Sequence, residues 1–97
     1  MAAHLIVVSG LPGVGKTSVA AIVAARIGAV HLSIDAVEEA MLASGVPAGW
    51  TVGVAAYESV RAVAELNLRS GNDVVIDAAP GTVEEVADEL VSRIGTP

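Results

Sequence analysis

The sequence contains no cysteine and no phenylalanine, and its aromatic side chains are Trp50 and Tyr57 alone. The absence of cysteine excludes disulfides, thiolate metal sites and cysteine catalysis. With 54% apolar residues in a chain of 97, a folded core is expected, and it must be largely aliphatic. Lysine is scarce as well, because Lys16 is the single lysine in the chain. A function that needs a side-chain ammonium group must therefore use this residue.

Two further absences limit the partners and the location of the protein. No apolar run approaches the roughly 18 residues that cross a bilayer, and the stretch over residues 1–4 is too short for a signal-peptide leader. The formal net charge of −6 argues against a surface for nucleic acid or for anionic membranes. These observations predict a cytoplasmic protein that binds neither nucleic acid nor membrane, with residues 1–97 forming one domain.

Short β-branched runs alternate with helical patterns along the chain. Strands are predicted over Leu5–Val8, Val30–Ser33 and Val74–Ile76, and helices over Lys16–Ile27, Ala36–Ser44, Val54–Ser70 and Val83–Ile94. Near-continuous apolar strands separated by helices predict an α/β fold with a parallel sheet covered on both faces. Ligands of such sheets bind at the carboxyl ends of the strands. Those ends deliver Ser9, residues 33–35 and Asp77, which are expected along one edge.

The first predicted strand runs directly into a complete phosphate-binding loop of the Walker A type, G-x-x-x-x-G-K-[ST]. The loop consists of Gly10, Leu11, Pro12, Gly13, Val14, Gly15, Lys16 and Thr17, and the helix that follows continues with Ser18. Backbone N–H groups of such a loop and the N-terminus of its helix favour phosphate. Lys16 would reach the β- and γ-phosphates, and the Thr17 hydroxyl would complete the shell of a Mg²⁺ ion. Residues 10–18 are therefore predicted to bind ATP or another NTP.

Acidic residues follow the other two predicted strands. Asp77 ends the run over residues 74–77 and is expected to hold Mg²⁺, directly or through water; the alternatives are an exposed acid at a strand end or a cap for the next turn. Asp35 is a candidate general base or substrate anchor that accepts the proton of an acceptor hydroxyl. It also fits the N-cap of a helix, paired with Glu38 in a capping box. The two roles are compatible, because a capping carboxylate can also face the cleft.

The segments VVSGLPGVGKTSVA, HLSIDAV and VVIDA together resemble the P-loop kinases of the zeta-toxin and chloramphenicol-phosphotransferase kind, a group of small ATP-dependent phosphotransferases. The resemblance runs over residues 4–80. It implies a three-layer αβα P-loop NTPase (Rossmann-like) core that binds ATP and Mg²⁺, with Lys16 and Asp35 as catalytic residues and Thr17 and Asp77 at the metal. The reaction it implies is Mg²⁺-dependent phosphoryl transfer to the hydroxyl of a small molecule.

The sequence departs from this group in two ways. Members commonly have an arginine shortly after the acid of the second strand, whereas Val37, Glu38 and Glu39 stand here. After Asp77 the pattern predicts one more helix, so further strands, a lid with its arginines and an adenine-binding segment are missing, and a sheet of about three strands is expected. The alternative functions are a non-catalytic NTP-binding module, or a truncated fragment that pairs through the exposed edge of residues 5–8, as in a homodimer.

Other side chains are predicted to have structural roles. His4 and His31 are expected to be solvated or core histidines without acidic partners, and not metal ligands. Trp50 is expected to pack against the aliphatic core in preference to closing over a substrate. Arg61 and Arg69 are spaced for surface ion pairs with glutamates of their own helix, which is favoured over contact with phosphate.

Overall fold

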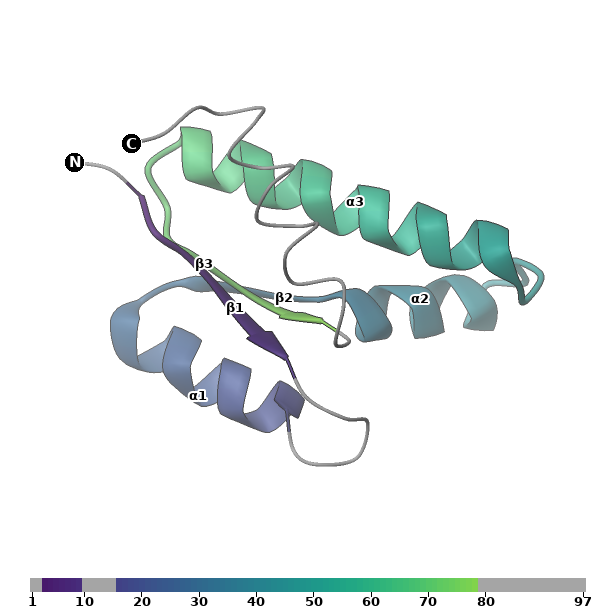
Figure 1. Ribbon diagram of the computed structural model, residues 1–97, viewed down its shortest axis with the longest axis horizontal. Helices are drawn as coiled ribbons and strands as arrows, with labels where there is room; N and C mark the ends of the chain where they lie inside the picture. The colour runs from purple at the N-terminus through teal and green to yellow at the C-terminus, as the bar shows by residue number, and fades with distance from the viewer. Residues whose placement is uncertain (1–2, 10–15, 79–97) are drawn as a thin grey trace.

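The computed structural model describes residues 3–9 and 16–78, and its elements follow the predicted order (Figure 1). The strands are β1 (Leu5–Ser9), β2 (Val30–Ser33) and β3 (Val74–Ala78), and the helices are α1 (Lys16–Ile27), α2 (Ile34–Ala43) and α3 (Trp50–Arg69). Every strand and helix predicted up to residue 78 is therefore present. The predicted helix over residues 83–94 lies outside the described residues.

β3 is the central strand of a parallel sheet with the order β1-β3-β2. All five of its residues are buried, as expected for a strand covered on both faces. In the register, Val8 of β1 and Ser33 of β2 lie on either side of Asp77. The carboxyl ends of the three strands therefore lie along one edge of the sheet, as predicted.

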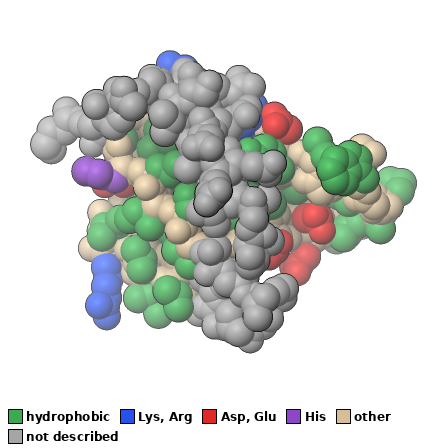
Figure 2. Space-filling view, in the orientation of Figure 1, with side chains coloured by type: hydrophobic (Ala, Val, Ile, Leu, Met, Phe, Trp, Pro, Cys, Tyr) green, Lys and Arg blue, Asp and Glu red, His purple; other side chains and the backbone are tan. Residues whose placement is uncertain are grey.

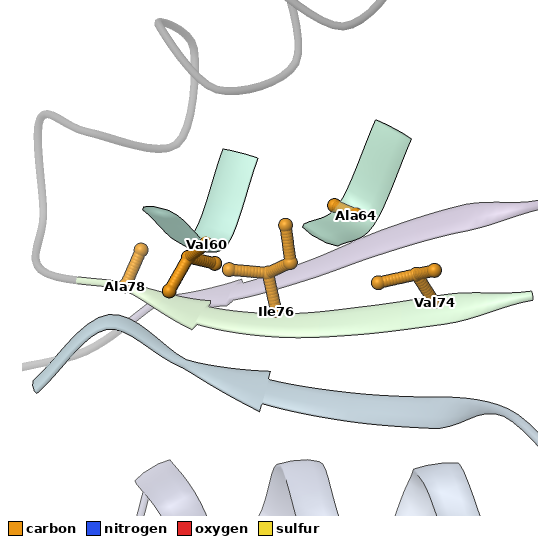
Figure 3. Packing of buried hydrophobic residues seen from close by; sticks show 5 residues of the cluster. All are labelled: Val60, Ala64, Val74, Ile76 and Ala78. Carbon is orange, nitrogen blue, oxygen red and sulfur yellow. The ribbon is translucent and has the colours of Figure 1, made fainter. Parts of the chain in front are cut away.

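Helices cover both faces of this sheet, which gives three layers (Figure 1). On one face, Ala20 and Ala24 of α1 pack with Val75 of β3. On the other face, Val60 and Ala64 of α3 pack with the alternate residues of β3, which are Val74, Ile76 and Ala78 (Figure 3). Alanine methyl groups let the helices lie close to the sheet, so a core without phenylalanine can still be densely filled. The predicted αβα core with a three-stranded parallel sheet is confirmed.

α3 begins at Trp50, four residues before the predicted start at Val54. The helix buries Val52, Ala56, Val60 and Ala64, a spacing of four that keeps these side chains on one face. Trp50 precedes Val52 by two residues, which is about 200° around the helix. The tryptophan is accordingly 86% exposed, and the prediction that it packs against the core is wrong. Figure 2 shows other hydrophobic side chains gathered at this end of the molecule, where α2 leads into α3.

The arginines of α3 are paired with acids of the same helix, as predicted. Arg61 lies 3.1 Å from Glu58 and 3.3 Å from Glu65, and Arg69 lies 3.2 Å from Glu65. The Arg61 side chain is 11% exposed, so its pairs are more sheltered than the surface pairs that the spacing predicts. None of the described helices is long and apolar enough to cross a membrane.

β1 lies at one edge of the described sheet, as the sequence predicts. Ile6 is exposed, and the other apolar side chains of β1 are partly buried. The strand is tied to the start of β3 through Asp73, whose Oδ1 accepts the His4 backbone N–H at 2.6 Å. The same oxygen lies 3.3 Å from His4 Nδ1, so the expectation that His4 lacks an acidic partner is wrong. The imidazole nevertheless remains solvated, because its side chain is 78% exposed.

Candidate functional site

The site predicted from the sequence lies at the carboxyl edge of the sheet, where the three strands end in register. Ser9 pairs with Ala78, and Ser33 pairs with Asp77. α1 begins at Lys16, the residue at which the sequence predicts the start of the helix, and its first turn holds no acidic residue. The N-terminus of a helix favours an anion, because its unpaired N–H groups carry partial positive charge. The backbone at this edge therefore suits phosphate.

Much of the phosphate-binding loop itself lies outside the described residues. This applies to Gly10, Leu11, Pro12, Gly13, Val14 and Gly15, and to the side chains of Lys16, Thr17 and Ser18. Their contacts with phosphate and Mg²⁺ stay predictions. The structure gives the two ends of the loop, because β1 ends at Ser9 and α1 starts at Lys16.

Among the buried side chains of the described residues, Asp77 is the single charged one, and it is completely buried on the central strand. Its Oδ2 lies 2.7 Å from His31 Nε2, and its Oδ1 accepts a hydrogen bond of 2.9 Å from Ser33 Oγ. A buried charge is costly without such partners, and hydrogen bonds to a carboxylate are stronger than those between neutral groups. The alternative of an exposed acid at a strand end is therefore wrong. The expectation that His31 lacks an acidic partner is wrong as well.

The sequence does not predict His31 at this site, and it predicts Ser33 at this edge without its contact with Asp77. His31 and Ser33 lie two residues apart on β2, so their side chains point to one face of the sheet, which is the face of Asp77. The signal in the sequence is a histidine and a serine at alternate positions of one strand, with an acid on another. It becomes informative once the order β1-β3-β2 makes these two strands neighbours.

Ser33 and not Asp35 is the N-cap of α2, so the predicted capping box of Asp35 and Glu38 is wrong. Ser33 has an extended backbone (φ −119°, ψ 120°), and its Oγ accepts the Ala36 N–H at 3.2 Å. Serine caps a helix about as well as aspartate does, so the helix can begin directly after the strand. Asp35 is consequently an exposed residue in the first turn of α2, where the helix dipole favours its charge. Glu38 faces α3, since its Oε2 lies 3.5 Å from the place that a Cβ atom would occupy if Gly53 carried a side chain.

The described side chains fit a Mg²⁺ ion that is bound together with phosphates. Mg²⁺ prefers oxygen ligands and usually combines one or two carboxylates with phosphate oxygens and several waters. Among the described residues, each Asp77 oxygen has one hydrogen-bond partner, and a carboxylate oxygen has a further lone pair for a cation or for a metal-bound water. Among residues 3–9 and 16–78, no group of three His, Cys, Asp or Glu side chains could hold a metal ion. Asp77 is therefore suited to a metal site that is completed by the nucleotide.

A parallel strand that leads through a glycine-rich loop into a helix, with an acid at the end of a neighbouring strand, defines a P-loop nucleotide-binding fold of the kinase-like kind. The chain belongs to the AAA domain family, whose model matches residues 5–92. Among curated proteins there is no match.

Two solved structures share this fold over nearly the whole chain. A “putative kinase” from Chloroflexus aurantiacus J-10-fl has 26% sequence identity and a TM-score of 0.77, covering 93% of this chain and 53% of that one. The APS kinase CysC of Mycobacterium tuberculosis, as a cysteine-to-alanine mutant, has 20% identity and a TM-score of 0.67, covering 97% of this chain and 69% of that one. The chain thus spans about half the length (53%) of the first structure. The predicted likeness to part of a P-loop kinase is confirmed.

Proposed function

We propose that this chain binds ATP with Mg²⁺ and transfers the γ-phosphoryl group to a hydroxyl of a small molecule. The observation that carries the proposal is the alignment of the three strand ends. This alignment brings the start of α1, the Asp77 carboxylate and the start of α2 to one edge of the sheet. ATP is the nucleotide of choice because both similar structures are named as kinases.

Each part of the edge has its own task in the proposed reaction. Residues 10–15 and the start of α1 bind the β- and γ-phosphates, and Lys16 neutralises their charge. Thr17 and Asp77 hold Mg²⁺, which supplies further charge neutralisation to the phosphate oxygens when it is bound. Asp35 accepts the proton of the acceptor hydroxyl while that oxygen bonds to the γ-phosphorus. The bond from the γ-phosphorus to the bridging oxygen breaks, and ADP leaves.

A non-catalytic nucleotide-binding module is the second candidate, and the positions of the arginines favour it. An arginine on the transferred group is worth about 10³–10⁵ in rate. Among the described residues, Arg26 lies in the last turn of α1, at the end away from the loop, and Arg61 and Arg69 pair with glutamates of α3. Arg26 is therefore at the opposite end of α1 from the phosphate-binding loop, and Arg61 and Arg69 are engaged by carboxylates of their own helix. Binding without transfer is consistent with this arrangement.

Asp35→Asn is expected to reduce ADP formation from Mg-ATP by at least about 100-fold, because a general base contributes roughly 10²–10⁴ in rate. The amide keeps the size of the side chain, so the affinity for Mg-ATP in calorimetric titration should stay within about threefold of the wild type. Glu39→Gln is the matched control, since it removes an exposed charge one turn later in α2 and should change neither quantity.

Three outcomes separate the candidates in this experiment. Loss of ADP formation in Asp35→Asn with retained binding supports the kinase. Wild-type protein that binds Mg-ATP but forms no ADP, with or without a panel of small-molecule hydroxyls, supports the module. Wild-type protein that does not bind Mg-ATP contradicts both.

Pairing of two chains through β1 is a third proposal, supported by the apolar side chains of this edge strand. We expect sedimentation to give the mass of a dimer. Ile6→Lys should shift the protein toward the monomer, because a lysine on an edge strand disfavours strand pairing. Ile22→Lys, at an exposed position of α1, is the matched control and should leave the mass unchanged. A wild-type monomer at high protein concentration would contradict the pairing.

A further inference from the structure

Both described partners of the Asp77 carboxylate come from β2. His31 Nε2 lies 2.7 Å from Oδ2, and Ser33 Oγ donates to Oδ1 at 2.9 Å. The aspartate is fully buried, and the His31 side chain is 22% exposed. With one partner on each oxygen, the carboxylate is held against rotation about its last bond. The ionised carboxylate can only accept, so His31 must carry its proton on Nε2 for this bond to form.

Ser33 connects this carboxylate to the start of α2. Its Oγ donates its one proton to Asp77 and at the same time accepts the Ala36 N–H at 3.2 Å. Asp35, the candidate base, lies in the same first turn of α2. One hydroxyl group thus links the Asp77 carboxylate to the helical turn that carries Asp35.

We propose that His31 and Ser33 are positioning residues, which orient the Asp77 carboxylate toward Mg²⁺ and so determine how strongly Mg²⁺ increases the affinity for nucleotide. The inference rests on the proposed binding of ATP with Mg²⁺. Partners that orient a metal-binding carboxylate typically change metal affinity by about 10–100-fold when they are removed. Ser33 additionally fixes the first turn of α2 relative to β3.

The strand itself argues against a purely structural purpose for this cluster. The residues before Asp77 on β3 are Val74, Val75 and Ile76, which fill the core on both faces without polar atoms. A buried polar cluster is generally no more stabilising than apolar side chains of similar size. The two hydrogen bonds from described residues leave a further lone pair on each carboxylate oxygen, as a metal ligand requires.

The test compares ATP affinity in EDTA with ATP affinity in Mg²⁺, measured by calorimetric titration of the full chain. The gain from Mg²⁺ is the factor by which ATP affinity is higher in Mg²⁺ than in EDTA. His31→Leu removes the donor and should lower this gain by about 10–100-fold. Affinity in EDTA should stay within about threefold, since the phosphates do not contact His31 in the proposed site. His31→Gln is the matched control, because its amide N–H can occupy the place of Nε2 and should restore most of the gain.

Two further comparisons test whether the effect acts through Asp77 and provide a second variant in case the first does not fold. In an Asp77→Asn background, His31→Leu should have no further effect on the gain from Mg²⁺, because residues that act through one another are not additive. If His31→Leu does not fold, Ser33→Ala with Ser33→Thr as control provides the same comparison. An unchanged gain in the folded donor-free variant overturns the inference.

The hydrogen bond can also be tested without nucleotide. Long-range ¹H–¹⁵N correlation spectra should show His31 protonated at Nε2, with a shift of its signals in Asp77→Asn. A proton on Nδ1 alone would overturn the inference even if ATP binds. A wild-type protein with this tautomer that does not bind ATP in EDTA or in Mg²⁺ would overturn the proposed function and, with it, the role of the cluster at Mg²⁺. A wild type that binds ATP while the variants keep its full gain overturns the inference alone.

Discussion

Lys16→Ala is expected to weaken the binding of Mg-ATP by roughly 10- to 150-fold in calorimetric titration. A hydrogen bond to a charged group contributes about 1.5–3 kcal/mol, and each 1.4 kcal/mol changes affinity tenfold. Lys16 stands at the first position of α1, and the chain has no second lysine to take its place. The loss should therefore be carried by this residue alone.

Two further variants relate this loss to the position and the shape of the charge. Lys16→Arg should bind almost as weakly as the alanine variant, because a planar guanidinium does not replace a compact ammonium between phosphate oxygens. Arg26→Ala removes a positive charge from the other end of α1 and should leave the affinity within about twofold. Equal affinities of Lys16→Ala and wild type would contradict the proposed position of the phosphates.

Ile76→Ala is expected to lower the free energy of unfolding by about 2–5 kcal/mol. Ile76 is fully buried at the middle of the central strand and packs in one cluster with Val60 and Ala64 of α3 (Figure 3). Because β1 and β2 hold β3 from both sides, the strand cannot move into the space that the shorter side chain leaves. Proteins of this size have about 5–15 kcal/mol of stability in total, so much of it would be lost.

Urea unfolding followed by circular dichroism measures this change as a shift of the midpoint. Ile22→Ala is the matched control, since Ile22 is 55% exposed on α1 and the same substitution there should stay within about 0.5 kcal/mol. Equal losses for the two variants would contradict the position of Ile76 in the core.

The features that the sequence predicts well depend on local patterns. β3 follows from the run Val74–Ile76, and α1 follows from the loop that ends at Lys16. The parallel sheet then follows from the alternation of strands and helices. The predicted start of α2 is wrong because Ser33 and Asp35 are both good N-caps. Which of the two caps the helix depends on where the preceding strand ends.

The features that the sequence does not predict depend on contacts between distant segments. His31 and Asp77 are 46 residues apart and meet because β2 pairs with β3. The sequence predicts that α3 starts at Val54, whereas the helix starts at Trp50, so Trp50 and the buried Val52 lie on opposite sides of it. Both errors concern geometry and not residue type, so they could be removed only by knowing the strand order and the phase of the helix.

The alanines that join α1 to the sheet also set a distance. Ala20 and Ala24 are buried against Val75, so the spacing between α1 and β3 is the width of methyl groups. A larger side chain at either alanine would push the helix outward, and Lys16 would move with it, because it belongs to the same rigid element. A displacement of about 1 Å can cost 100-fold in a site that depends on position. The small residues behind α1 therefore act as a spacer, and variation in the core can alter phosphate binding without touching the loop.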